Sequence, residues 1–225
     1  MTNYYQTIIN ELDDRINELT YEPSNSLISY ENAIILVLQK LEEIKKYIKK
    51  NGFKDDEAEI LFFKQLKPQL VSKLIYFNAI YKIETKRPRG GDKIIKKYLN
   101  VELSKIKRYF DANLEFYKYY RTNSTHLDYK FFLRGKHDIK LSLDTYYFEA
   151  DHNFATSHDY KVAKIIANDL IQVYLEDQLN NNNHRKLLEI PPLNWTGSKT
   201  SLIELIYSLH SQGSIDNGNT DIKII

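Results

Sequence analysis

Four consecutive residues near the end of the chain have the side chains and the position needed to bind a phosphate group. Ser198, Lys199, Thr200 and Ser201 stand directly before an apolar pattern that is typical of a helix. Backbone N–H groups at the start of a helix attract anions, and hydroxyl and ammonium groups add further donors. The sequence therefore predicts a phosphate contact at this helix N-terminus, with double-stranded DNA as the expected partner.

Three more basic residues complete the predicted DNA-binding set. Arg185 and Lys186 lie shortly before Ser198 in the sequence, and Lys223 lies two residues before the last one. Basic side chains neutralise backbone phosphates and give an affinity that falls steeply with salt. We expect Arg185 and Lys186 to clamp the DNA backbone beside the helix N-terminus.

The patterns of catalytic and metal sites are missing from the sequence. It has no cysteine, and no two of its six histidines flank a glutamate at the spacing of a helical zinc site. Phosphate loops, dinucleotide fingerprints and nucleophile elbows are also absent. His152 and His158, with Asp151 and Asp159 beside them, could hold a metal, but polar loop histidines are the better interpretation. We therefore expect no enzyme activity, no metal and no cofactor.

Charge is unevenly distributed, although the net charge is +2. Residues 86–140 contain 15 basic and 6 acidic side chains, a net charge of +9, whereas residues 141–225 contain 6 and 11, a net charge of −5. A basic segment is typical of a phosphate-binding surface, but lysines on the exposed faces of long helices give the same count. The Gly- and Pro-containing loop Lys86–Gly91 is either a solvated connector or a phosphate contact.

The N-terminal half predicts a bundle of helices. Apolar residues recur with the helical period in four segments: 4–20, 29–50, 55–83 and 92–120. Ser29 is the expected N-cap of the second helix, and Pro68 either kinks the third or begins a new one. These segments predict an antiparallel helical domain over residues 1–125, with a boundary where the helical period fades.

The C-terminal half predicts further helices and the outline of a helix-turn-helix. Thr156 and Asp159 occupy capping-box positions before a helix that extends to about residue 179, and Ser201 and Glu204 do so before a helix that extends to His210. Gly213 then turns the chain, and residues 219–221 could cap a second helix. This outline is weak evidence for DNA binding, because many helical hairpins share it.

The sequence also limits the compartment. No run of eighteen or more residues is apolar enough to span a membrane, and the first residues lack the basic and apolar regions of a signal peptide. The absence of cysteine fits a reducing compartment. We expect a cytoplasmic protein that does not contact membranes.

Longer stretches of the sequence resemble the RteC family of regulators, which conjugative transposons carry. The resemblance rests on several segments that occur in the same order: Tyr119-Tyr120-Arg121, Leu127 to Gly135 (LDYKFFLRG), Ser157 to Lys164 (SHDYKVAK), and Trp195 to Tyr207 (WTGSKTSLIELIY). Residues 1–118 agree with the family in their helical character.

The resemblance implies a fold and a function. It implies a transcriptional activator that binds upstream of the excision genes of tetracycline-resistance transposons. It also implies a mainly α protein with a helical N-terminal domain, residues 1–125, and a C-terminal helical domain related to winged helices, residues 126–225. These are implications of the resemblance and do not follow from spacing or charge.

An alternative function remains open at this point. A helical adaptor that docks on RNA polymerase or on another regulator would need exposed apolar patches among its N-terminal helices. DNA binding should weaken steeply with salt, whereas an apolar contact should not. The sequence leaves the oligomeric state and the DNA sequence that is recognised undetermined.

Overall fold

The computed structural model describes residues 2–20, 26–141, 144, 146–188 and 195–214, and for residues 2, 3, 20, 26 and 181–188 it describes the backbone alone. Within these ranges the regular structure is helical, with no strand, which confirms the mainly α class. No helix in this part of the chain is both long enough and apolar enough to cross a bilayer. The chain divides into two compact units, Met1–Asn181 and Asn182–Ile225.

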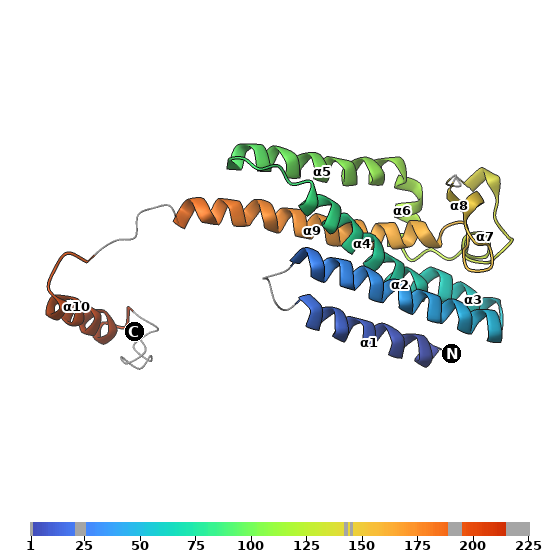
Figure 1. The fold of residues 1–225 in the computed structure, drawn as a ribbon, viewed down its shortest axis with the longest axis horizontal. Helices are drawn as coiled ribbons and strands as arrows, with labels where there is room; N and C mark the ends of the chain where they lie inside the picture. Colours follow the sequence, from blue (N-terminus) through green and yellow to red (C-terminus); the bar gives the residue numbers. More distant parts are fainter. Residues whose placement is uncertain (1, 21–25, 142–143, 145, 189–194, 215–225) are drawn as a thin grey trace. The chain divides into compact units, whose positions relative to one another are not determined.

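The first unit begins with two antiparallel helices, α1 (Thr2–Thr20) and α2 (Ser26–Asn51) (Figure 1). Helix α2 also packs against α4 (Lys67–Thr85). Leu12 of α1 and Ile44 of α2 are fully buried, as their helical spacing predicts. The predicted N-cap Ser29 is wrong, because α2 begins at Ser26 and includes Ser29 within its first turn.

The chain stays helical across Pro68, with one wider π-helical turn just before the proline. Helix α3 (Asp56–Leu61) continues through a π-helical turn, η2 (Phe62–Leu66), directly into α4. Pro68 has no N–H to donate to the carbonyl of Lys64, and the backbone N–H of Lys67 bonds to the carbonyl of Phe62, five residues back. The chain therefore stays helical past the proline at the second position of α4.

The single helix predicted over residues 92–120 is two helices. Helix α5 (Asp92–Ala112) and helix α6 (Leu114–Arg121) are separated at Asn113, whose φ of −121° and ψ of 26° are not helical. The Asn113 side-chain amide donates to the carbonyl of Tyr109 at 3.0 Å. Asparagine side chains compete in this way for backbone partners, so the helix ends where the apolar pattern alone predicts that it continues.

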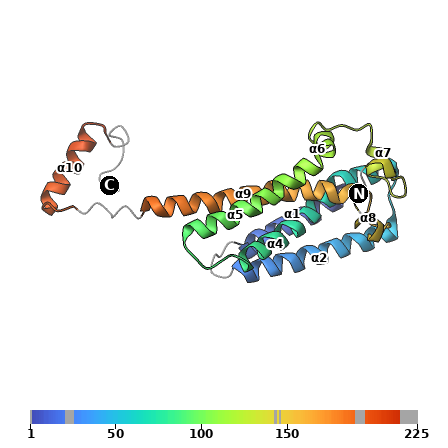
Figure 2. The same ribbon diagram turned by 90° about the horizontal axis from the view of Figure 1, so that it is seen from above.

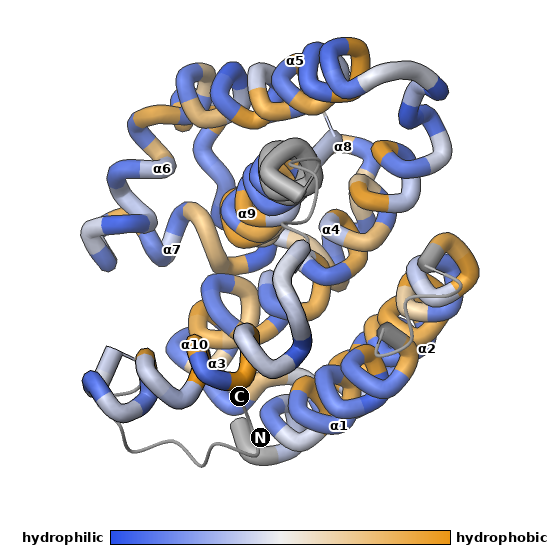
Figure 3. Tube along the Cα trace, turned by 90° about the vertical axis from the view of Figure 1, so that its left-hand side faces the viewer, coloured by the Kyte–Doolittle hydropathy of each residue, from blue (hydrophilic) through white to orange (hydrophobic). Residues whose placement is uncertain are grey.

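Short helices connect α6 to the long helix α9 (Asp159–Leu188). They are α7 (Asp128–Phe131), the 3₁₀ helix η3 (Ile139–Leu141) and α8 (Tyr146–Glu149). Helix α9 lies beside α5 and α4, as Figures 1 and 2 show, and Ile80, Leu99 and Leu175 from these three helices share one buried cluster. Each of the long helices carries both apolar and hydrophilic residues (Figure 3), as amphipathic packing requires.

The division of the chain differs from the boundary expected between residues 125 and 126. Phe131, Phe132 and Val162 belong to the same buried cluster as Tyr5 of α1. Residues 126–181 therefore pack with the N-terminal helices, and the two compact units separate at Asn181. The segment after Arg121 lacks helical periodicity because short helices and turns cover the core there, and it does not act as a linker.

Candidate nucleic-acid interface

Helix α10 (Lys199–Ser211) in the second unit begins with the residues predicted to contact phosphate. Ser198 is its N-cap: the Ser198 hydroxyl accepts from the Ser201 backbone N–H at 3.1 Å and lies 2.8 Å from the Ser201 hydroxyl. Lys199, Thr200 and Ser201 are all exposed in the first turn. The arrangement presents hydroxyls, an ammonium and helix-terminal N–H groups together, which is a donor set for an anion.

The predicted capping box at Ser201 and Glu204 is wrong by one turn. Ser201 lies inside the helix, and the chain turns into α10 at Trp195–Ser198, where the indole N–H of Trp195 donates to the carbonyl of Ser198 at 2.9 Å. A Cβ atom on Gly197 would lie 3.0 Å from the Trp195 ring. Glycine therefore lets the indole fold over the backbone, and this turn places Ser198 at the cap.

Replacing Ser198 by alanine should loosen the start of α10. Loss of an N-cap side chain costs about 0.5–2 kcal/mol, so the amides of the first turn should exchange their hydrogens about two- to thirty-fold faster. Ser208→Ala is the matched control, because the Ser208 hydroxyl bonds to the carbonyl of Glu204 within the helix and caps nothing. Equal exchange rates in Ser198→Ala and the native protein would show that Ser198 is not the cap.

The structure brings together four of the seven predicted DNA-binding residues. Ser198, Lys199, Thr200 and Ser201 share the first turn of α10 and its cap. Arg185 and Lys186 belong to the last turns of α9, but their side chains lie outside the described residues, as does all of Lys223. The described geometry therefore supports the phosphate contact at α10 and leaves the backbone clamp as a prediction.

A cationic surface lies in the first unit, where the loop after α4 joins α5. Lys86, Arg89, Lys93 and Lys97 are all exposed there, and we call these four residues the basic corner. Arg87 of the same loop pairs with Glu84 at 3.2 Å and donates to Gln178 of α9 at 3.1 Å. Arg87 therefore holds the loop against the bundle, whereas the four side chains of the basic corner are exposed to solvent.

The remaining charge of residues 86–140 is partly neutralised within the bundle. Besides Arg87–Glu84, five ion pairs between described residues involve basic residues of this segment: Lys105–Glu102, Lys107–Asp111, Arg121–Asp169, Lys130–Asp138 and Arg134–Glu59. Burial raises the pKa of Glu59, but hydrogen bonds from Arg134 and its charge outweigh burial, so the pKa of Glu59 lies below its ordinary value. The net charge of +9 therefore does not form one continuous cationic surface.

A buried polar network joins the helical run around Pro68 to the segment after α6. The Lys64 ammonium donates to both carboxylate oxygens of Asp128, at 2.8 and 2.9 Å, and to the carbonyl of Ser124. Asp128 also accepts from the Tyr119 hydroxyl at 2.6 Å. Burial, reinforced by Asp128, raises the pKa of Tyr119 and keeps its phenol protonated as the donor.

A second lysine of this helical run makes a parallel connection. Lys67 pairs with Asp159, and the side chains of these two residues are 10% and 3% exposed. Lys67 also donates to the carbonyl of Phe154. Asp159 in turn accepts from the backbone N–H of Thr156 at 3.3 Å, but α9 begins at Asp159 and the buried Thr156 hydroxyl has no hydrogen-bond partner in the described part of the chain, so the predicted capping box with Thr156 as the cap is wrong. Lys64 of η2 and Lys67 of α4 therefore bind residues at both ends of the segment 124–159 and hold it against this helical run.

The histidines do not form a metal site in the described part of the chain. No group of three or more His, Asp or Glu side chains there has the arrangement that could hold a metal ion. His152 is exposed, as expected of a loop histidine. The same expectation is wrong for His158, which is 1% exposed and lies with its ring centroid 3.9 Å from that of Phe131.

The comparisons with known proteins give a family. Residues 61–225 match the model of the family described as RteC protein. The chain belongs to the RteC family. No curated protein and no solved structure matches the chain. The part that matches the RteC family begins at Leu61 and so includes both buried lysine connections, the basic corner and α10, whereas α1 and α2 precede it.

The structure also shows how the residues that carry the RteC resemblance are used. Asp128, Arg134 and Asp159 come from two of the resembling stretches, and each of them makes a polar contact that joins segments distant in the sequence. Tyr119, from a third stretch, donates to Asp128 and so supports one of these contacts. Sequence reasoning missed Lys64 and Lys67, although two lysines within the apolar run that starts at Ile60 were a signal that they could be buried with partners.

Proposed function

We propose that the protein is a DNA-binding transcriptional regulator that activates the excision genes of a conjugative transposon. The observation that carries this proposal is the RteC family match over residues 61–225, which covers both α10 and the basic corner. In this proposal the protein acts in the cytoplasm on double-stranded promoter DNA and has no catalytic site of its own.

The second unit is the proposed reading domain, with a helix-turn-helix or winged-helix arrangement. Helix α10 supports it, because it ends in a tight turn: Gly213 has a φ of 73°, and the N–H of Ser214 bonds to the carbonyl of Leu209 at 2.9 Å. A left-handed glycine after a helix turns the chain sharply, as the connection between two helices of such a motif requires. The second helix expected after residue 219 lies outside the described residues.

The proposed roles of the cations differ between the two units. Lys199 and the N–H groups at the start of α10 hold a phosphate and so fix the orientation of a helix in the major groove, with Arg185 and Lys186 as further backbone contacts. The basic corner adds attraction that does not depend on sequence. The proposal therefore assigns sequence preference to the second unit and part of the salt-dependent affinity to the first.

Fluorescence anisotropy of a labelled promoter duplex in rising salt tests this proposal. Two variants compare the units: Lys199→Ala with Arg185→Ala, and Lys93→Ala with Lys97→Ala. Each variant removes two cations, so each should lower the slope of log affinity against log salt by about 2. The first should also reduce the preference for the promoter over a scrambled duplex, because these phosphate contacts fix the orientation of the helix that reads the bases, whereas the second should keep it.

Lys46→Ala with Lys50→Ala is the matched control, because these exposed lysines of α2 have the same four-residue spacing as Lys93 and Lys97. Its binding curve should equal that of the native protein. If Lys199→Ala with Arg185→Ala retains promoter preference, the reading surface lies elsewhere. If the native protein binds weakly and without preference for the promoter sequence, the proposal that it recognises DNA directly is wrong.

One observation favours the second candidate function, a helical protein–protein adaptor. Helix α2 exposes Ile28, Ile35 and Leu38, which are 53%, 53% and 49% exposed and share one side of the helix by their spacing. Apolar side chains gathered on one helix face are typical of a protein contact. In that proposal the partner is RNA polymerase or another regulator, and its binding persists at salt concentrations that abolish DNA binding.

A further inference from the structure

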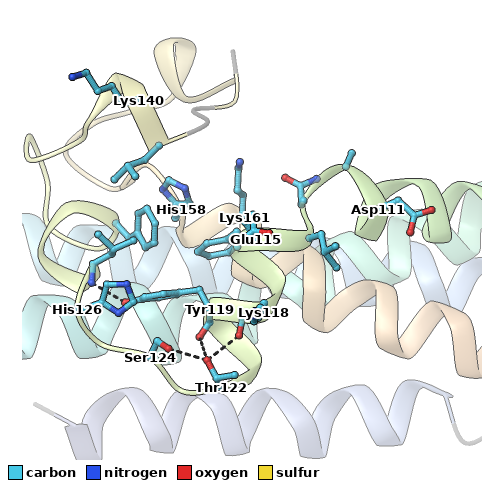
Figure 4. Close-up of a pocket in the computed structure, with 17 residues that line it drawn as sticks. Asp111, Glu115, Lys118, Tyr119, Thr122, Ser124, His126, Lys140, His158 and Lys161 are labelled. Atoms are coloured by element: carbon cyan, nitrogen blue, oxygen red, sulfur yellow. Dashed lines mark hydrogen bonds between the residues drawn. The ribbon is translucent and has the colours of Figure 1, made fainter.

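A cavity of about 590 Å³ lies within the first unit, between the junction of α5 with α6, the turn before α7 and the start of α9 (Figure 4). Drug-sized ligands occupy cavities of roughly 300–1,000 Å³. The DNA-binding proposal does not use this cavity. Its wall combines aromatic rings with cations, and this combination defines what it could bind.

The apolar part of the wall is built from rings that hold one another in place. Phe116 of α6 and Phe131 of α7 meet edge to face with centroids 5.4 Å apart. The His158 ring lies 4.8 Å from Phe116 and 3.9 Å from Phe131, and Tyr119 meets Phe131 edge to face at 5.1 Å. These rings are only 1–8% exposed, so they form a closely packed apolar base beneath the cavity and support its wall.

Three lysines give the cavity its charge. Lys161 follows His158 by one turn of α9, and Figure 4 shows these two side chains next to each other. The Lys161 side chain is 3% exposed, whereas Lys118 and Lys140 line the cavity from exposed positions. The acidic residues that line it are Asp111 and Glu115, so the lining carries one more positive than negative charge.

An incoming anion can replace Asp144 in its ion pair with Lys161. Its ammonium lies 3.6 Å from the carboxylate of Asp144, whose side chain is 48% exposed. An exposed carboxylate regains water when it leaves an ion pair, so replacing it is inexpensive. The attraction of a buried ammonium for an incoming anion is stronger than that of a surface lysine, because water screens it less.

We propose that this cavity binds a small planar aromatic or conjugated molecule with a single carboxylate-type anion. The ring system lies on the apolar wall that Phe116, Phe131 and His158 support, and the anion pairs with Lys161 in place of Asp144. Lys118 and Lys140 attract the anion toward the cavity from the surface. The size of the cavity and the single excess positive charge both fit a monoanion of modest size.

Isothermal titration with 1-naphthoate and with 1-naphthamide tests the proposal. The two probes have the same ring system and nearly the same shape, and they differ in charge. One equivalent of naphthoate should bind, at least about ten-fold more tightly than naphthamide, a factor that corresponds to about 1.4 kcal/mol. Lys161→Gln should remove this ten-fold preference, and Lys46→Gln on α2 is the control that should retain it.

A second variant covers the case in which Lys161→Gln does not fold. Ala112 lines the cavity from an exposed position at the end of α5, so Ala112→Phe should fill space without disturbing the core. It should abolish naphthoate binding and leave the circular dichroism melting curve unchanged. Equal affinity for the two probes, or undiminished naphthoate binding in Ala112→Phe, would overturn the proposal. Neither result depends on DNA binding, so the function proposed above can fail or stand separately.

Discussion

Replacing Lys67 by methionine should lower the free energy of unfolding by about 3–5 kcal/mol, because it leaves the Asp159 carboxylate buried without its cation. Asp159 is 3% exposed, and the ammonium of Lys67 is its ion-pair partner across 92 positions of the sequence. The carbonyl of Phe154 also loses this donor. Urea unfolding followed by circular dichroism measures the loss directly.

Lys73→Met on the same helix is the control. Lys73 also pairs with an aspartate, Asp13 of α1, but the two side chains are 25% and 42% exposed. Exposed pairs contribute about 0–1 kcal/mol, so this variant should unfold almost as the native protein does. Adding Asp159→Asn to Lys67→Met should recover much of the lost stability, because the amide carries no charge. Equal losses for Lys67→Met and Lys73→Met would contradict the argument.

The helices themselves could be predicted well because their signal is local. Leu12, Ile44 and Ile165 are fully buried at positions that the helical period marks as inward-facing. The errors fall where one side chain changes the backbone. Asn113 divides a predicted helix, and the missing N–H of Pro68 is accommodated by a π-helical turn that apolar spacing does not reveal.

The buried polar connections could not be predicted, since their partners are far apart in the sequence. Lys64 and Asp128 are separated by 64 positions, and neither has a spacing that marks it as one of a pair. The same limit explains why the two compact units divide after Asn181 and not where the helical period fades. A segment such as 126–157, with turns and short helices, has the pattern of a linker, although Phe132 within it is completely buried.

The sequence likewise predicts only part of the candidate interface. Ser198 to Ser201 could be predicted to act together because one helical turn brings them together, whatever surrounds them. The charge of residues 86–140 could be counted, but the count does not show which cations are neutralised. Arg134 contributes to the +9 yet is bound by Glu59 at 2.8 Å, whereas Lys93 and Lys97 remain exposed.

Acid should destabilise the protein through His158. Burial among Phe116 and Phe131, with the nearby charge of Lys161, lowers the pKa of His158 to about 3 from its ordinary value of 6.5, although a hydrogen bond with the Leu141 backbone opposes the shift. Between these two pH values the unfolded chain holds a proton on this imidazole and the folded chain does not. Stability contributed by neutral His158 is therefore present above about pH 6.5 and is lost as the pH falls toward 3.

The slope of stability against pH isolates this effect. One proton taken up on unfolding corresponds to about 1.4 kcal/mol per pH unit, so the native protein should lose roughly 2 kcal/mol between pH 6.5 and 4.5 that His158→Gln does not lose. His152→Gln, which changes an exposed histidine, should keep the native slope. Because the comparison concerns slopes, it holds even if His158→Gln is less stable at every pH. Identical slopes for the native protein and His158→Gln would mean that the buried imidazole takes up its proton in the folded state.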